Sequence, residues 1–314
     1  MLIIKPINRF LMNKILVASL FFWSLSIPLF VAQNANPLDV PVYGSIKDAL
    51  KDKKAKQLNL RDHDLFYVSE EIKELKELQF LNLMRNHLEK WDASILTLKK
   101  LEVLNLKQNA LKYIPDEVGN LNKLVRLNLA SNEISYIPKT LGELKGVRFL
   151  HLSINTITSI PETIGNCKAL EVLELDNNEL SYLPTSISKL SKLKVLNLGY
   201  NQFNEVDEKW TQLKALEALN LEYNQLQKFP SKIKMLQQLK TLILNNNKLT
   251  ELPETVTHLQ HLELLIVSNN KLHQLPNNLK SLTNLKTLIL IGNPIALKEK
   301  ERIIKELPNC KIYF

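Results

Sequence analysis

The chain has 314 residues, of which 45% are hydrophobic and 7% aromatic, and its formal net charge is +9. A chain of this length ordinarily folds into about two domains. Nucleic-acid binding requires a concentrated stripe of basic residues. Here the basic residues are spread along the sequence and form no such stripe. Composition therefore argues against a nucleic-acid partner.

Residues 1–35 have the features of a targeting segment. Lys14 precedes an apolar run over residues 15–32, and small residues stand at Ala32 and Ala35. This order predicts a secretory signal peptide that is cleaved from the mature chain. The alternative is a retained anchor, because the run is close to the length of a membrane span. A membrane is a predicted partner only in that second case.

From residue 55 onward the sequence repeats every 23 residues. The unit is clearest in residues 101–123, LEVLNLKQNALKYIPDEVGNLNK, and eleven copies follow one another without a gap. The first positions of these copies are Ala55, Leu78, Leu101, Leu124, Val147, Leu170, Leu193, Leu216, Leu239, Leu262 and Leu285. Self-similarity at a fixed period of this length indicates a solenoid. Residues 55–298 are therefore expected to form one elongated domain with a continuous core.

Each position of the unit has an expected structural role. Leu101, Leu104 and Leu106 point inward from a short strand, because alternate side chains of a strand face opposite sides. Asn109 stands where the chain turns off the strand, so its amide is expected to bond backbone groups that the turn would bury unpaired. Pro115 fixes φ where a short helix or 3₁₀ turn begins.

The pattern LxxLxLxxNxLxxIPxxLGxL resembles the 23-residue type of leucine-rich repeat, as found in Ras-group intracellular proteins and in secreted bacterial repeat proteins. This resemblance covers roughly residues 55–298. It implies an α/β fold, a right-handed, curved leucine-rich-repeat solenoid with a parallel β-sheet on the concave face and short helices or 3₁₀ turns on the convex side. For function the resemblance is weaker, since such repeats serve many partners.

Both ends of the repeat array are expected to be capped. Residues 36–54 predict a linker and a small N-terminal cap helix, in which Ser45 and Asp48 have the spacing of an N-cap pair. Residues 299–314 form the predicted C-terminal cap, with an amphipathic helix over 296–307 and a final strand after it. The side chains expected to point inward from that helix are Leu297, Ile303, Ile304 and Leu307.

The two cysteines are predicted to remain unpaired. Cys167 stands in a column of core leucines, where a free Cys behaves as a small hydrophobe. Cys310 lies about six strands further on, on the order of 30 Å away at ~4.8 Å per strand, which exceeds disulfide reach. The chain also lacks any Asn-x-Ser/Thr sequon. Export without disulfides or glycosylation favours a bacterial envelope.

No residue constellation predicts catalysis, a cofactor or a metal site. His258 and His261 flank a core leucine without a third ligand at a fixed spacing. The run over residues 61–64, Arg-Asp-His-Asp, is the irregular turn of the first copy. The two large residues Trp91 and Trp210 are expected in the core, where they replace smaller side chains.

The strand side chains that point away from the core define the expected concave surface. Midway along it, aromatic and charged residues gather on adjacent strands, as in binding hot spots. This predicted central patch consists of Phe149, His151, Glu174, Asp176, Tyr200, Glu222 and Tyr223. An apolar strip is expected to continue it towards the C-terminus, and this strip consists of Ile243, Leu264, Ile266, Ile289 and Ile291. An exposed strip would extend the patch or meet a second subunit; alternatively, Phe149 and the Ile residues serve strand formation.

A further column alternates in charge and predicts ion pairs between neighbouring strands. This charge ladder consists of Arg148, Glu171, Lys194, Glu217, Lys240, Glu263 and Lys286. Exposed pairs contribute only ~0–1 kcal/mol each, so the ladder is expected to tune register and solubility.

The sequence thus predicts a non-enzymatic protein-interaction module that is secreted or held in the cell envelope and binds a protein partner on its concave sheet. One alternative is binding of an envelope polysaccharide, with Tyr200 and Tyr223 stacking on sugars. The other is an intracellular scaffold like the Ras-group proteins, if the leader is not used.

Overall fold

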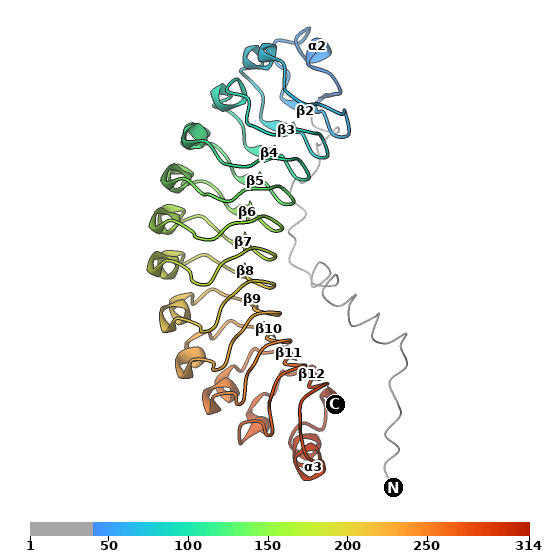
Figure 1. Cartoon of the computed structure of the whole chain (residues 1–314), viewed down its shortest axis with the longest axis vertical. Helices are drawn as coiled ribbons and strands as arrows, with labels where there is room; N and C mark the ends of the chain where they lie inside the picture. Colours follow the sequence, from blue (N-terminus) through green and yellow to red (C-terminus); the bar gives the residue numbers. More distant parts are fainter. Residues whose placement is uncertain (1–39) are drawn as a thin grey trace. The chain divides into compact units, whose positions relative to one another are not determined.

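The computed structural model describes residues 40–314, so the predicted leader and the first residues of the linker lie outside the described part. Within residues 40–314, 13 strands form a single sheet in which each strand pairs with the next one along the chain (Figure 1). The strands are β1 (Val42–Tyr43), β2 (Gln57–Asn59), β3 (Phe80–Asn82), β4 (Val103–Asn105), β5 (Arg126–Asn128), β6 (Phe149–His151), β7 (Val172–Glu174), β8 (Val195–Asn197), β9 (Ala218–Asn220), β10 (Thr241–Ile243), β11 (Leu264–Ile266), β12 (Thr287–Ile289) and β13 (Lys311–Tyr313).

All strand pairs are parallel, and the register follows the repeat. Val103 pairs with Arg126 and Leu104 with Leu127, one copy further along the chain. A constant period therefore places the same position of successive repeats side by side across the sheet. The predicted columns of side chains are confirmed as rows of neighbours.

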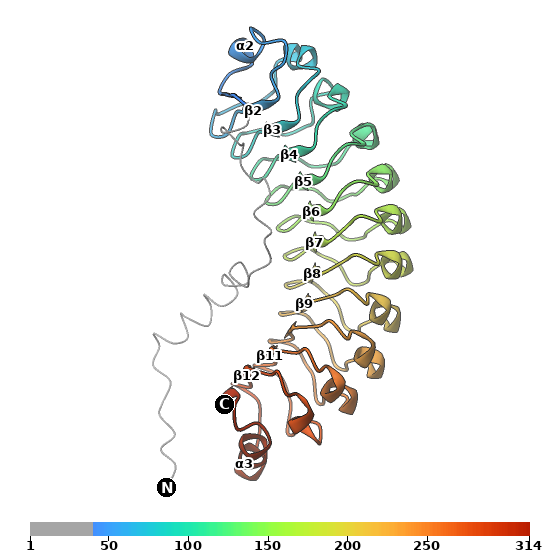
Figure 2. The ribbon, with the colours of Figure 1, turned by 180° about the vertical axis from the view of Figure 1, so that it is seen from behind.

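Opposite the strands, each turn of the solenoid carries a short 3₁₀ helix (Figure 2). These helices are η2 (Glu70–Glu74), η3 (Ile95–Thr97), η4 (Asp116–Asn120), η5 (Lys139–Glu143), η6 (Glu162–Asn166), η7 (Thr185–Lys189), η8 (Glu208–Gln212), η9 (Ser231–Met235), η10 (Glu254–His258) and η11 (Leu279–Ser281). Pro115 caps η4 with φ −71°, the angle that its ring enforces. The predicted fold class, a right-handed α/β solenoid with its parallel sheet on the concave side, is confirmed.

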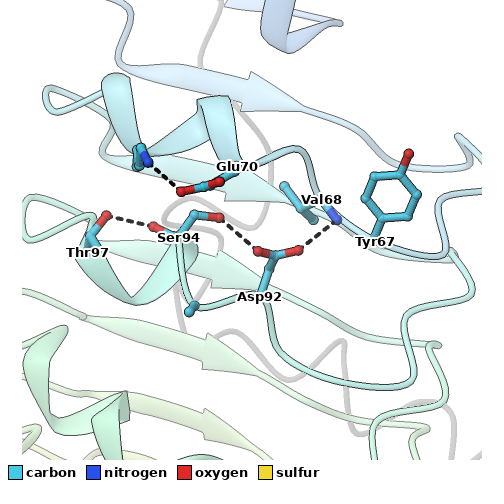
Figure 3. Close-up of a pocket in the computed structure, with 8 residues that line it drawn as sticks. Tyr67, Val68, Glu70, Asp92, Ser94 and Thr97 are labelled. Carbon is cyan, nitrogen blue, oxygen red and sulfur yellow. Dashed lines mark hydrogen bonds and ion pairs between the residues drawn. The ribbon is translucent and has the colours of Figure 1, made fainter.

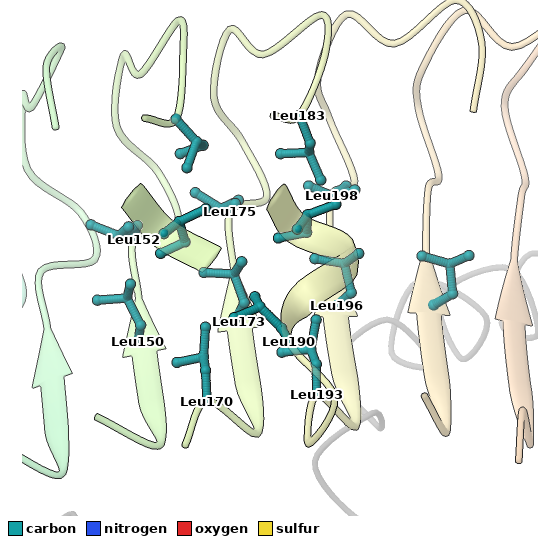
Figure 4. Close-up of a cluster of buried hydrophobic side chains, with 14 of the residues drawn as sticks. Leu150, Leu152, Leu170, Leu173, Leu175, Leu183, Leu190, Leu193, Leu196 and Leu198 are labelled. Carbon is teal, nitrogen blue, oxygen red and sulfur yellow. The ribbon is translucent and has the colours of Figure 1, made fainter. Parts of the chain in front are cut away.

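Leucine columns fill the space between the sheet and the 3₁₀ helices. Leu101, Leu104 and Leu106 are fully buried, and Figure 4 shows the equivalent side chains of β6, β7 and β8 interleaving. Truncating one such leucine to alanine typically costs ~2–5 kcal/mol. Trp91, Trp210 and Cys167 are buried as predicted, and burial raises the pKa of the Cys167 thiol to about 11.

A ladder of asparagines closes the turns after the strands β3 to β12. In the seventh strand's turn, Asn178 Nδ2 donates to the carbonyl oxygens of Leu152 and Leu175, both at 3.0 Å. Its Oδ1 accepts the amide of Ile157 at 3.0 Å. The predicted structural role of this column is confirmed, because each amide satisfies backbone groups of two successive repeats.

The predicted charge ladder forms in part: of its six neighbouring pairs within residues 40–314, four are ion pairs, and Lys194 with Glu217 and Lys240 with Glu263 are not. Glu171 accepts a hydrogen bond from Arg148 Nε at 2.7 Å and lies 3.1 Å from Lys194 Nζ. The hydrogen bond with Arg148 and the contact with Lys194 together hold the pKa of Glu171 below its usual range, against the effect of partial burial. The other pairs in the ladder are Glu217 with Lys240 and Glu263 with Lys286.

At the N-terminal end, helix α2 (Ile46–Ala49) is capped by Ser45, whose hydroxyl accepts the amide of Asp48 at 3.1 Å. At the other end, α3 (Leu297–Glu306) is followed by β13, the predicted final strand. No helix within residues 40–314 is long and apolar enough to cross a membrane.

One prediction for α3 is wrong. Ile303 and Leu307 are buried, but Leu297 and Ile304 remain 64% and 47% exposed. Residues seven apart share one side of an α-helix, since it makes 3.6 residues per turn. Leu297 and Ile304 therefore lie together on a side different from that of Ile303, and a single narrow face cannot bury all four.

Candidate binding surface

Phe149 was predicted to be exposed at the start of the central patch, and this is wrong. Its side chain is only 5% exposed. The guanidinium of Arg126, on the preceding strand, lies over the ring at 4.1 Å from its centroid, and that of Arg148 lies at 5.2 Å. Parallel strands are only ~4.8 Å apart, so a long neighbouring side chain covers the ring, and the contact is favourable as a cation–π interaction.

A chain of polar contacts crosses three strands next to this ring. Arg126 Nη1 donates to His151 Nε2 at 3.0 Å, and His151 Nδ1 donates to Glu174 Oε2 at 2.7 Å. Both bonds form only if the imidazole carries its proton on Nδ1. Burial alone would raise the pKa of Glu174, but His151 and Arg126 outweigh it and hold that pKa below its usual range.

Two further carboxylates of the central patch are held by neutral groups. Asp176 accepts hydrogen bonds from Asn197 Nδ2 at 2.8 Å and from the hydroxyl of Ser153 at 2.5 Å. Glu222 accepts from Asn220 and Asn245, both at 3.1 Å. Within residues 40–314 neither carboxylate belongs to an ion pair. Burial raises the pKa of Asp176, as expected for a charge without a cationic partner.

Tyr200 and Tyr223 form the exposed part of the central patch. Their rings stack with centroids 4.2 Å apart and an angle of 13° between planes, and they are 41% and 45% exposed. Both residues have left-handed backbone angles, with φ 54° and 49°. Burial, followed by the nearby Glu222 and Tyr223, raises the pKa of Tyr200 to about 12, so this phenol keeps its proton at neutral pH.

The apolar strip is not the exposed surface that was predicted. Ile243, Ile266 and Ile289 are buried, while Leu264 and Ile291 are partly buried. The three Ile residues are direct partners in the register of β10, β11 and β12, so their branched side chains pack against one another. The strand-forming alternative accounts for these three residues.

Two features of the surface were not predicted from the sequence. The first is the cover over Phe149. Arg126 is the only charged residue at this repeat position in the central strands, and it stands one repeat before Phe149, so the sequence does contain a signal for it. A row of exposed aromatic residues outside the concave sheet also went unnoticed, and it consists of Phe66, Tyr67, Tyr113, Tyr136 and Tyr182.

The other histidines form local contacts. The His261 ring bonds the carbonyl oxygen of Gln237 at 2.7 Å. The ring of His63 bonds the carbonyl oxygens of Arg61 and Gly44 at 2.8 and 2.9 Å. In the described part of the chain, no group of three or more His, Cys, Asp or Glu side chains is arranged to hold a metal ion.

Comparison with known proteins identifies the family. Residues 76–134 match a model described as leucine rich repeat, and residues 131–222 and 207–311 match a model described as leucine-rich repeat region. The chain belongs to the leucine-rich repeat family. Its fold is that of a protein-interaction module, a class that is typically non-catalytic. No curated protein matches the chain.

Several solved structures are similar. A leucine-rich repeat protein of Leptospira interrogans is 33% identical, with 83% of this chain and 84% of that chain covered and a TM-score of 0.51. The ectodomain of the Arabidopsis receptor kinase HAESA, solved with a peptide hormone ligand, is 30% identical, with a TM-score of 0.67. The match covers 76% of this chain but only 42% of the receptor chain. An internalin of Listeria monocytogenes, 22% identical over 82% of this chain and 73% of that chain, shares the fold with a TM-score of 0.73.

Proposed function

We propose that this leucine-rich repeat protein binds a protein partner on its concave sheet, with the stacked pair Tyr200 and Tyr223 at the centre of the contact. The observation that carries the proposal is the arrangement of the two rings, which are exposed yet already fixed against each other. Tyrosine is enriched in the residues that dominate interface energetics. Rings that are ordered before binding lose less conformational entropy when the partner arrives.

The charges beside the rings indicate the chemistry of the partner. Asp176 and Glu222 are held by amide and hydroxyl donors, and neither forms an ion pair with a cationic residue of the described part of the chain. A partner that places Lys or Arg side chains over these carboxylates would compensate the charge and gain charge-assisted hydrogen bonds. A basic segment of a protein or peptide therefore fits the central patch. The peptide hormone in the HAESA structure supports a partner of this class.

We also propose that the protein acts outside the cytoplasm, in a bacterial envelope or beyond it, by binding alone and without a cofactor or a catalytic step. The signal-like residues 1–35 support export, and the Leptospira protein that aligns over most of both chains supports a bacterial origin. Fractionation of the source cells tests this part, because recovery of the full-length chain in the cytoplasm would favour the intracellular scaffold instead.

A comparative capture experiment tests the binding site. The tagged full chain is crosslinked in an envelope fraction, and the recovered proteins are compared with those from a Tyr200→Ala/Tyr223→Ala variant. The matched control is Met235→Ala/Ile304→Ala, which removes two exposed apolar side chains from surfaces outside the concave sheet. We expect only the first variant to lose the captured proteins. Equal recovery of captured proteins from all three chains would show that the Tyr pair is not part of the site. Loss of the captured proteins on addition of free oligosaccharide would favour the polysaccharide alternative.

A further inference from the structure

A second aromatic surface lies on the flank of the solenoid, between the strands and the 3₁₀ helices. Tyr67, Tyr113, Tyr136 and Tyr182 occupy the same position of their repeats, and all four are exposed, Tyr67 to 74%. Tyr113 and Tyr136 are direct neighbours, joined by a parallel backbone bridge. The four positions are separated by two, one and two repeats, so they recur at about 10, 5 and 10 Å along the flank.

Two pockets open beside the first half of this row. One has a volume of about 530 Å³ and is lined by Tyr67, Val68, Glu70, Lys73, Asp92, Ala93, Ser94 and Thr97 (Figure 3). The other has a volume of about 310 Å³ and is lined by Trp91, Ala93, Leu96, Thr97, Tyr113, Pro115, Glu117 and Asn120. The two pockets are adjacent, since Ala93 and Thr97 line both, and each has a tyrosine in its lining. The two pockets together are called the groove.

The groove arises where the repeat departs from its own pattern. Trp91 and Asp92 replace the usual Ile-Pro pair, and η3 has three residues where η4 has five. The Trp91 ring is directed into the core, and its Nε1 donates to the carbonyl oxygen of Tyr113 at 2.9 Å. The shorter 3₁₀ helix leaves the surface above Ala93 open. The altered sequence of this repeat therefore creates a hollow on the flank, while Trp91 keeps the core closed.

The polar wall of the groove is fixed and presents acceptors. Asp92 accepts the amide of Val68 at 3.2 Å and the hydroxyl of Ser94 at 3.0 Å, and Figure 3 shows its carboxylate between these two groups. A carboxylate has about four lone-pair positions, so Asp92 keeps acceptor capacity beyond these two bonds. Within residues 40–314 the hydroxyl of Tyr67 forms no hydrogen bond.

We propose that this groove and the tyrosine row bind an extended saccharide chain. The faces of a sugar ring carry C–H groups that pack on an aromatic ring, while its hydroxyls donate to carboxylates such as Asp92. A polymer of sugar units repeats along its length, as the tyrosines do. An added peptide strand would instead require unpaired backbone groups, and here Ser135 N already donates to Lys112 O. The site is separate from the concave sheet and does not depend on the function proposed for that sheet.

Co-sedimentation of the full chain with insoluble chitin, cellulose and purified peptidoglycan tests the proposal. We expect at least one of these polymers to retain the protein. A Tyr67→Ala/Tyr113→Ala variant should bind that polymer about tenfold more weakly, the effect of losing two ring contacts. A Tyr67→Phe/Tyr113→Phe variant keeps both ring faces and should bind nearly as well, and Tyr200→Ala/Tyr223→Ala should be retained like the unaltered chain.

The results that would contradict the saccharide proposal differ from those that would contradict binding on the concave sheet. Retention by none of the three polymers overturns the proposal, and so does retention that the Ala variant leaves unchanged. Unfolding by urea shows whether the variants remain folded, which is expected because both side chains are exposed. If the Ala variant instead loses a captured protein while no polymer retains the chain, the groove holds a protein segment and the saccharide assignment is wrong.

Discussion

Tyr200 and Tyr223 stand one repeat apart and stack with their centroids 4.2 Å apart, close to the spacing of parallel strands. The sheet register itself therefore brings the two rings together. Both residues also adopt the left-handed backbone region, which costs a non-Gly residue ~1–3 kcal/mol. Asn177, Asn246 and Asn269 take the same position in other repeats, and Asn tolerates this region better than Tyr.

We therefore expect that Tyr200→Asn/Tyr223→Asn keeps or raises the free energy of unfolding, by up to about 1 kcal/mol, while partner capture falls. Urea denaturation of the two chains measures the first effect and the capture experiment the second. A variant destabilised by more than about 1 kcal/mol would show that the rings are structural.

The His151 contact is predicted to be structural. In His151→Phe the guanidinium of Arg126 and the carboxylate of Glu174 both lose a buried partner. Removal of one member of such a group costs about 3 kcal/mol or more, which urea denaturation at neutral pH would register. His261→Phe, at an exposed position, is the control and should change stability by less than about 0.5 kcal/mol. Similar stabilities for both variants would contradict the proposed role of the three-strand contact.

Asp176 is predicted to cost stability when charged. Its pKa is raised in the folded chain, so the folded state disfavours the carboxylate, and the penalty grows as the pH rises from the unfolded pKa and is complete above the folded pKa. Asp176→Asn should thus be more stable at pH 7 by on the order of 0.5–1 kcal/mol. The difference should vanish below the unfolded value of about 3.9. Stability curves from pH 3 to pH 8 check this, and a variant that is less stable at pH 7 would refute it.

Each asparagine of the ladder is predicted to contribute more to the free energy of unfolding than any exposed ion pair does. Asn178→Ala leaves two carbonyl oxygens and one amide without their buried partner. Because each such group costs ~1–3 kcal/mol, we expect a loss of about 3 kcal/mol or more in urea denaturation. Asn166→Ala, an exposed residue of the 3₁₀ helix just before that repeat, is the matched control. Comparable losses in both would contradict this assignment.

The repeat made most of the fold predictable from the sequence. The same pattern recurs in eleven copies. A strand of three residues is too short to recognise alone, but it is recognised when the equivalent residues of the other repeats show the same pattern. Asn109 and Leu104 were assigned correctly for this reason, and so was the charge ladder around Glu171. The residue types within one repeat predicted the role of each position, and the 23-residue period extended that prediction to the other copies.

Exposure on the concave sheet was harder to predict, because it depends on lateral neighbours. Phe149 is covered by Arg126 from the preceding strand, and Ile266 is buried between two other isoleucines. Alternation along one strand assigns a side chain to a face but says nothing about what lies beside it. Tyr113 and Tyr136 stand at a position that the repeat pattern leaves unspecified, so the pattern predicts nothing about it.

The central claim is that the partner contacts the concave sheet at the tyrosine pair. Site-specific photocrosslinking tests it most directly, with a photoreactive benzoyl-phenylalanine placed at Tyr200 in one chain and at Lys189, on the convex helix η7, in another. We predict partner crosslinks from position 200 and none from position 189. Crosslinks from position 189 with none from position 200 would contradict it.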